Sequence, residues 1–75
     1  MATKQFEQDN EYSCFNKAAP DEPLFILRAQ DRTAPGLVIQ WANRARKLGA
    51  SEAKVGEALL IAKAMEAWPN RKDPD

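Results

Sequence analysis

Apolar positions predict a helix over residues 35–48. They recur at spacings of three and four, which place them on one side of a helix of 3.6 residues per turn. The apolar side consists of Leu37, Val38, Trp41, Ala45 and Leu48, with Ile39 as the exception. Pro35 is tolerated in a first helical turn, and Gly49 after three basic residues is a typical helix end.

A second helix is predicted over residues 52–68, between Ser51 as N-cap and Pro69. Its broad apolar face consists of Val55, Ala58, Ile61, Ala62, Met65 and Trp68. A second, flatter face consists of Ala53, Gly56, Leu60, Ala64 and Ala67. A helix that is apolar on two faces usually packs on both. Because Gly56 costs about 0.8–1 kcal/mol relative to alanine inside a helix, we expect another backbone to approach there: residues 22–30, a second copy or a target protein.

Residues 22–30 are ambiguous, because Leu24–Leu27 are all apolar and follow Pro23. A short strand is one possibility, but the rest of the chain offers no obvious partner strand. An isolated strand would leave its backbone groups unpaired. We therefore favour a short helix over 22–30.

Together these elements predict an all-α fold. A compact three-helix unit, about 22–30, 35–48 and 52–68, forms a helical domain over residues 21–68. Residues 1–20 have no helix-long apolar face and are expected to form a flexible N-terminal arm. The polar tail 69–75 is expected to fray. Trp41 and Trp68 lie on apolar faces, so we expect both in the core.

Charge is balanced overall, with eleven basic and eleven acidic residues, so a basic footprint over the whole domain is absent. The distribution is uneven: residues 7–22 carry five acids against one lysine, and residues 28–54 carry six basic residues against two acids. The polar side of the 35–48 helix is the candidate partner-binding surface: Gln40, Asn43, Arg44, Arg46 and Lys47. These residues would contact phosphates or an acidic protein patch. Alternatively, they form a solvated face whose positive charges stabilise the C-terminal end of the helix through its dipole. Arg28 and Arg32 are candidate contacts for an anionic ligand.

Catalytic chemistry has little support, because the chain has no histidine and a single cysteine, Cys14. A nucleophilic cysteine needs a base or another influence that lowers its pKa, so we expect Cys14 to be a small apolar anchor that pins the arm to the helices. The carboxylates of Asp21, Glu22 and Asp31 lack EF-hand spacing. We therefore expect no enzyme activity, no metal and no cofactor.

The chain resembles a group of short bacteriophage and prophage proteins. The resemblance covers residues 14–68, and its most specific part is the spacing Asp-Glu-Pro-x-Phe-x-Leu-x-Ala-x-Asp over residues 21–31. It rests on Cys14-Phe15, Ala18, Asp21 to Leu27, Ala29, Asp31, Ala34-Pro35, Val38, Trp41-Ala42, Ala58, Ala62, Met65 and Trp68. The resemblance implies a bacterial cytoplasm and a task such as blocking a host or defence protein or moderating transcription. It transfers no site residues.

We therefore expect a small accessory protein that binds a bacterial protein and inhibits or modulates it by occlusion. A nucleic-acid regulator with a helix-turn-helix-like pair is the first alternative, although the second helix, rich in alanine, would read bases poorly. The other alternative is an oligomeric sponge for a small anionic ligand. The longest apolar run, Leu24 to Leu27, is too short to span a bilayer, so we expect a protein of the bacterial cytoplasm, with self-association as a further possibility.

Overall fold

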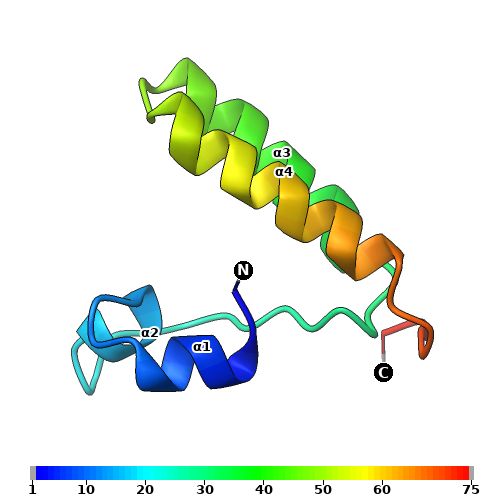
Figure 1. The fold of residues 1–75 in the computed structure, drawn as a ribbon, viewed down its shortest axis with the longest axis horizontal. Helices are drawn as coiled ribbons and strands as arrows, with labels where there is room; N and C mark the ends of the chain where they lie inside the picture. The colour runs from blue at the N-terminus through cyan, green and yellow to red at the C-terminus, as the bar shows by residue number, and fades with distance from the viewer. Residues whose placement is uncertain (1, 75) are drawn as a thin grey trace.

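The computed structural model describes residues 2–74, and over these residues it contains four helices and no β-strand longer than a single bridge (Figure 1). The helices are α1 (Lys4–Asp9), α2 (Cys14–Lys17), α3 (Ala34–Lys47) and α4 (Glu52–Glu66). The predicted all-α class is therefore confirmed. The two long helices begin and end within two residues of the predicted limits.

α3 and α4 form an antiparallel hairpin whose turn is specified by local sequence (Figure 1). Gly49 has a φ of 93°, a conformation that other residues rarely adopt. The Ala50 N–H donates to the Ala45 carbonyl at 2.9 Å, and the Gly49 N–H donates to the Arg46 carbonyl at 3.1 Å. This pair of bonds is a Schellman motif. Two residues later the Ser51 hydroxyl accepts from the Lys54 N–H at 3.2 Å and caps α4.

The core between α3 and α4 is built from small side chains. Ala42 and Val55 are fully buried and Ala58 nearly so, with Val38 and Leu59 packed against them. Val55 is the largest fully buried side chain over residues 2–74. Small side chains at the contact allow two helices to approach closely, so the buried stripe of α3 centres on alanines and leaves larger residues at its border.

The prediction that both tryptophans lie in the core is wrong. Trp41 is 48% exposed and Trp68 is 50% exposed. Helical periodicity placed Trp41 on the apolar side of α3, but the contact with α4 is rotated toward Ala42, which is fully buried. An indole at the centre of this contact would hold the helices too far apart for Ala42 and Ala58 to meet.

Residues 1–20 were expected to be a flexible arm, but the described part of this segment contains two short capped helices. The Thr3 hydroxyl accepts from the Phe6 N–H, and the Ser13 hydroxyl accepts from the Asn16 N–H, both at 3.1 Å. Ser13 also donates to the Glu7 carbonyl at 2.8 Å, and the Asn16 amide donates to the same carbonyl at 2.7 Å. Polar side chains hold α1 against α2, so a search for apolar periodicity could not find them.

The prediction of a helix over residues 22–30 is wrong. This segment runs extended between α2 and α3, with turns only at its ends (Figure 1). A helix of nine residues has an unfavourable nucleus and few hydrogen bonds to offset it. It would need a packing surface, but the buried side of α3 is already covered by α4.

The tail, expected to fray over 69–75, returns to the segment before α3. The Arg32 N–H donates to the Lys72 carbonyl at 3.0 Å, and the Lys72 N–H donates to the Gln30 carbonyl at 2.7 Å. These bonds form an isolated parallel bridge between Asp31 and Lys72. The start of α3 is therefore tied to the chain that follows α4.

Candidate functional site

The side of α4 that faces away from α3 is apolar and has no partner among residues 2–74. We call it the outer face of α4; it consists of Ala53, Gly56, Leu60, Ala64 and Ala67. Val55, Ala58 and Ala62 lie on the opposite side of the helix and are buried. Leu60, the one large residue of the outer face, is 61% exposed. The helix therefore has two apolar faces, of which one is covered within residues 2–74, and the expected packing on the second face stays a prediction.

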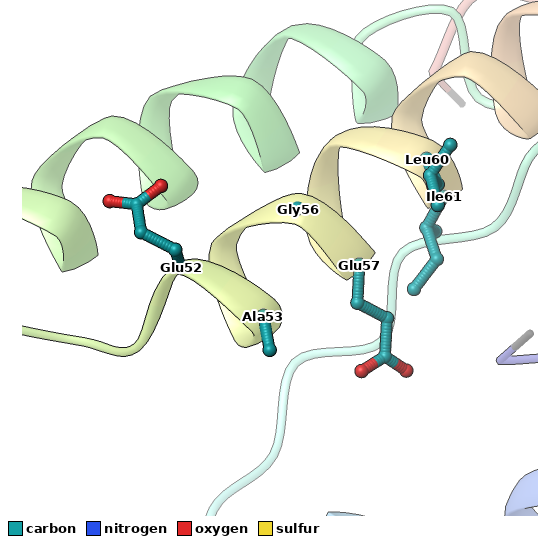
Figure 2. Close-up of a pocket in the computed structure, with 6 residues that line it drawn as sticks. All are labelled: Glu52, Ala53, Gly56, Glu57, Leu60 and Ile61. Atoms are coloured by element: carbon teal, nitrogen blue, oxygen red, sulfur yellow. The ribbon is translucent and has the colours of Figure 1, made fainter.

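A hollow of about 600 Å³ lies along the first half of the outer face (Figure 2). Its lining residues are Glu52, Ala53, Gly56, Glu57, Leu60 and Ile61. The two carboxylates point to different sides of the helix, and the alanine and glycine lie between them (Figure 2). All six residues belong to α4, so the hollow is an open, shallow surface of one helix that is apolar between two acidic side chains.

Gly56 lies at the floor of this hollow, and nothing else among residues 2–74 packs against it. A Cβ built on Gly56 meets nothing within 4 Å. The expectation that residues 22–30 approach Gly56 is therefore wrong, because that segment forms no helix and leaves the site open. A second copy or a target protein remain as the predicted neighbours.

The polar residues predicted on α3 are all exposed: Gln40, Asn43, Arg44, Arg46 and Lys47. Arg46 differs from the rest, because its Nε lies 3.3 Å from the Glu52 Oε1 across the turn. Gln40, Arg44 and Lys47 follow helical spacing on the side of α3 that faces away from Val38 and Ala42.

Gln40, Arg44 and Lys47 of α3 and the outer face of α4 therefore lie on opposite sides of the hairpin. Arg46 is the exception, because its contact with Glu52 places it at the border of the hollow. One flat partner surface cannot contact both the outer face of α4 and the far side of α3. Of the charged rim that the sequence predicted on α3, only Arg46 lies beside the apolar contact of α4.

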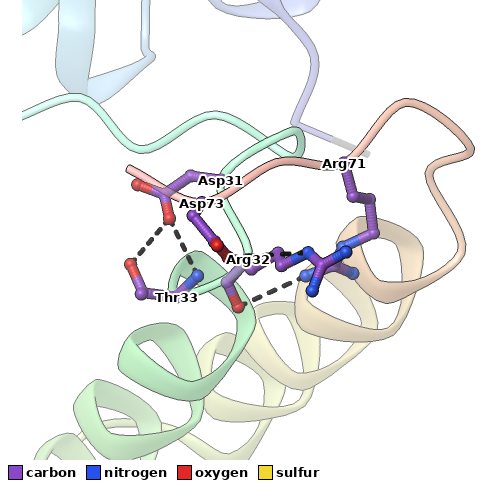
Figure 3. Close-up of polar contacts among 5 residues, drawn as sticks. All are labelled: Asp31, Arg32, Thr33, Arg71 and Asp73. Carbon is purple, nitrogen blue, oxygen red and sulfur yellow. Dashed lines mark hydrogen bonds and ion pairs between the residues drawn. The ribbon is translucent and has the colours of Figure 1, made fainter. Parts of the chain in front are cut away.

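Arg28 and Arg32, the predicted anionic-ligand contacts, have different surroundings. Arg32 Nε lies 3.7 Å from Asp73 Oδ1, and both side chains are largely exposed (Figure 3). Arg28 lines a hollow of about 210 Å³ together with two carboxylates, those of Asp31 and Asp73. Carboxylates beside the guanidinium oppose the entry of an anion, so the structure does not bring the two arginines together as an anion site.

Asp31 lies beside Arg32, whose contacts with Asp73 and Arg71 join the start of α3 to the tail (Figure 3). Its Oδ1 accepts from the Thr33 hydroxyl at 2.7 Å and from the Thr33 N–H at 2.8 Å. These two hydrogen bonds, with a smaller effect of the Arg71 charge, hold the pKa of Asp31 below its ordinary value. Arg71 in turn donates to the Met65 carbonyl at 3.0 Å and to the Arg32 carbonyl at 3.3 Å. This cluster is structural: every contact joins segments of the same chain.

A further exposed apolar surface was missed by the sequence analysis, which placed Leu24, Phe25 and Ile26 in a helix. Phe25 is 86% exposed and Ile26 is 68% exposed. The informative pattern was the succession of Pro23 and apolar residues without helical period, which favours an extended backbone.

Cys14 is exposed at the start of α2 and does not anchor the arm to the long helices, so that prediction is wrong. Over residues 2–74 no group of three or more histidine, cysteine, aspartate or glutamate side chains is placed to hold a metal ion. Within the same range no helix combines the length and the apolar character needed to cross a bilayer. The absence of enzyme activity and cofactors stays a prediction.

Comparison with known proteins gave no match to a protein-family model, to a curated protein or to a solved structure. The function is therefore argued from the surface of the molecule.

Proposed function

We propose that this chain acts by binding another protein through the outer face of α4. The observation that carries the proposal is the place of Gly56, a glycine inside a helix, at the floor of a hollow of about 600 Å³, with nothing within 4 Å of its missing Cβ. Glycine lowers helix stability by about 0.8–1 kcal/mol relative to alanine. A partner that packs against this backbone would offset that cost.

Binding would follow the usual arrangement of a protein interface, with an apolar centre and a polar rim. A side chain of the partner fills the hollow beside Leu60, and a basic group of the partner meets Glu57 at its border, since Glu52 already pairs with Arg46. Water is excluded from an apolar centre of this kind, which concentrates the binding energy in few residues. The partner we propose is therefore a protein with an exposed apolar anchor flanked by lysine or arginine.

The biological role we propose is inhibition or modulation of a bacterial host or defence protein by occlusion. The effect of the bound chain would come from covering a surface that the target needs. The resemblance to phage and prophage proteins over residues 14–68 supports this role, and it supports the bacterial cytoplasm as its place.

No specific observation favours the two alternatives. In a helix-turn-helix the helices cross at about 90–120°, whereas α3 and α4 run side by side along their length (Figure 1). α3 carries Arg44, Arg46 and Lys47, whereas α4, which would be the reading helix, carries two lysines, Lys54 and Lys63. For a sponge of anionic ligands, the carboxylates of Asp31 and Asp73 in the hollow with Arg28 are unfavourable.

The test is a comparison of three tagged chains in nuclease-treated bacterial lysate: the unchanged chain, Gly56→Leu and Gln40→Leu. Gly56→Leu fills the hollow, and Gln40→Leu adds the same side chain on the far edge of the hairpin. We expect one stoichiometric protein with the unchanged chain and with Gln40→Leu, and its loss with Gly56→Leu. Equal capture by all three chains, or capture by none, would contradict binding through the outer face of α4.

A further inference from the structure

The extended segment before α3 has free hydrogen-bonding groups along its backbone. Over residues 2–74, none of the backbone N–H and C=O groups of residues 23–27 takes part in a hydrogen bond. Unpaired N–H and C=O groups along an extended backbone can form hydrogen bonds with a second strand, as at the edge of a sheet. The sequence analysis rejected a strand here because the chain has no second strand to offer.

The segment is held at both ends. On one side the Glu22 N–H donates to the Ala19 carbonyl at 3.0 Å, and the Ala19 N–H donates to the Glu22 carboxylate at 3.3 Å. On the other side the bridge between Asp31 and Lys72 fixes the chain before α3. A strand whose ends are fixed loses less conformational entropy when it pairs than a free chain would.

Two copies of the segment can pair antiparallel with complementary residues opposite one another, if Phe25 of one copy lies opposite Phe25 of the other. In an antiparallel pair centred on Phe25, Glu22 lies opposite Arg28 of the second copy, and the same pair recurs at the other end. Leu24 lies opposite Ile26, Pro23 opposite Leu27, and Phe25 opposite itself. Opposite residues of an antiparallel pair share one face, where charge pairs and aromatic pairs stabilise the sheet. Self-complementarity of this kind is what a two-fold interface requires.

The position of Pro23 agrees with this register. In antiparallel strands every second residue directs its N–H and C=O groups toward the partner. If Phe25 occupies a pair without hydrogen bonds, Leu24 and Ile26 direct these groups inward, and Pro23 directs its nitrogen outward. The missing N–H of Pro23 then removes no hydrogen bond from the ribbon. It leaves the outer edge with one donor fewer, which disfavours pairing with a third strand.

We propose that two copies of this chain associate through residues 22–28 in an antiparallel two-stranded ribbon centred on Phe25, with backbone hydrogen bonds at Leu24 and Ile26. Glu22 and Arg28 contribute their side chains, because the Glu22 N–H and the Arg28 carbonyl are already bonded within the chain. The central aromatic pair, the two Leu24–Ile26 pairs and the two Glu22–Arg28 pairs form the contact. This association uses a surface separate from the outer face of α4 and does not depend on the proposed target.

The exposed surface of the single chain is large enough for such a contact. A compact monomer of 8.4 kDa exposes about 4,600 Å², whereas this chain exposes 6120 Å². The excess of about 1,500 Å² exceeds the roughly 800 Å² that each partner buries in an interface of standard size. Phe25 at 86% exposure and Ile26 at 68% supply part of this excess at the centre of the ribbon.

The first measurement is sedimentation equilibrium of the full chain over a concentration series, with amide hydrogen exchange followed by NMR. We expect a dimer of twice the chain mass, with slowed exchange at Leu24 and Ile26 and fast exchange at Phe25 and Leu27. A monomer at every concentration would overturn the proposal, and so would a dimer in which residues 23–28 exchange uniformly fast.

The second measurement uses charge reversal at Glu22 and Arg28, which both lie outside the helices. Glu22→Gln keeps an oxygen that can accept from the Ala19 N–H, and it separates loss of that bond from the effect of charge. Glu22→Arg and Arg28→Glu each place like charges opposite one another and should weaken the dimer about fivefold or more. The double variant Glu22→Arg with Arg28→Glu should restore the original affinity. Gly56→Leu is the control and should leave the dimer intact. Failure of the double variant to restore affinity, or dissociation by Gly56→Leu alone, would assign the contact to another surface.

Discussion

Asp31 and Thr33 illustrate how a single polar pair makes stability depend on pH. Because the two hydrogen bonds from Thr33 lower the pKa of Asp31 in the folded chain, their stabilising effect is fully present above the pKa of the unfolded chain. It is lost as the pH falls through the lower, folded pKa. The Thr33 hydroxyl contributes the largest part of this shift.

Thr33→Val should therefore raise the pKa of Asp31 toward its ordinary value. The free energy of unfolding should fall at neutral pH, and the difference from the unchanged chain should vanish in acid, where Asp31 is protonated in both. Carboxyl-carbon NMR titration and urea unfolding at both pH values measure these effects. Thr33→Ser is the control, since it keeps the hydroxyl. An equal loss of stability at both pH values would show that the effect of Thr33→Val does not pass through Asp31.

Two glycines of the hairpin should respond to alanine in opposite directions. Gly56→Ala should raise the free energy of unfolding by about 0.8–1 kcal/mol, because its Cβ meets nothing within 4 Å. Gly49→Ala should lower it by about 1–2 kcal/mol, because Gly49 has a φ of 93°. Urea unfolding of both variants measures the two changes. A loss of stability with Gly56→Ala would mean that another part of the same chain packs closely against Gly56 and leaves no space for a Cβ.

At the scale of elements, the contact between α3 and α4 depends on alanine at its centre. Ala42 is fully buried against Val55 and Ala58, so Ala42→Leu would force the helices apart. Overpacking of this kind costs about 1–3 kcal/mol. The neighbouring Asn43→Leu is exposed and should change stability by no more than about 0.5 kcal/mol. Thermal unfolding of the two variants measures the difference, and equal melting temperatures would contradict close packing at Ala42.

The elements that could be predicted are those whose limits are set by local chemistry. Ser51, Gly49 and Pro35 act within one turn of the helix that they bound, so α3 and α4 followed from the sequence. The outer face of α4 was predicted for the same reason, because helical spacing alone defines it.

The elements that could not be predicted depend on partners far along the chain or on side-chain hydrogen bonds. Residues 22–30 stay extended because no surface covers a helix there, and the tail is held by Gln30 and Arg32, some forty residues away. α1 and α2 rest on Ser13 and Asn16 instead of apolar periodicity. The half-exposed tryptophans follow from the rotation of the helix contact toward Ala42.

At the scale of the whole molecule, the helices form two separate pairs. Over residues 2–74, α1 packs on α2 and α3 packs on α4, and neither helix of one pair packs on the other pair. The radius of gyration is 13.0 Å, whereas a compact domain of 75 residues has one of about 11 Å. Stability in such a molecule is not expected to be uniform.

Amide exchange should therefore divide the chain into two units. Helices as short as α1 and α2 are unstable on their own, and here side-chain hydrogen bonds of Ser13 and Asn16 hold them together. Their amides should exchange much faster than those of Val55, Ala58 and Ala62 in α4. Ser13→Ala removes both the cap of α2 and the bond to Glu7, so it should speed exchange in the first pair while α4 stays protected. Equal protection of α1, α2 and α4, or loss of α4 protection in Ser13→Ala, would show instead that the two pairs unfold as one cooperative unit.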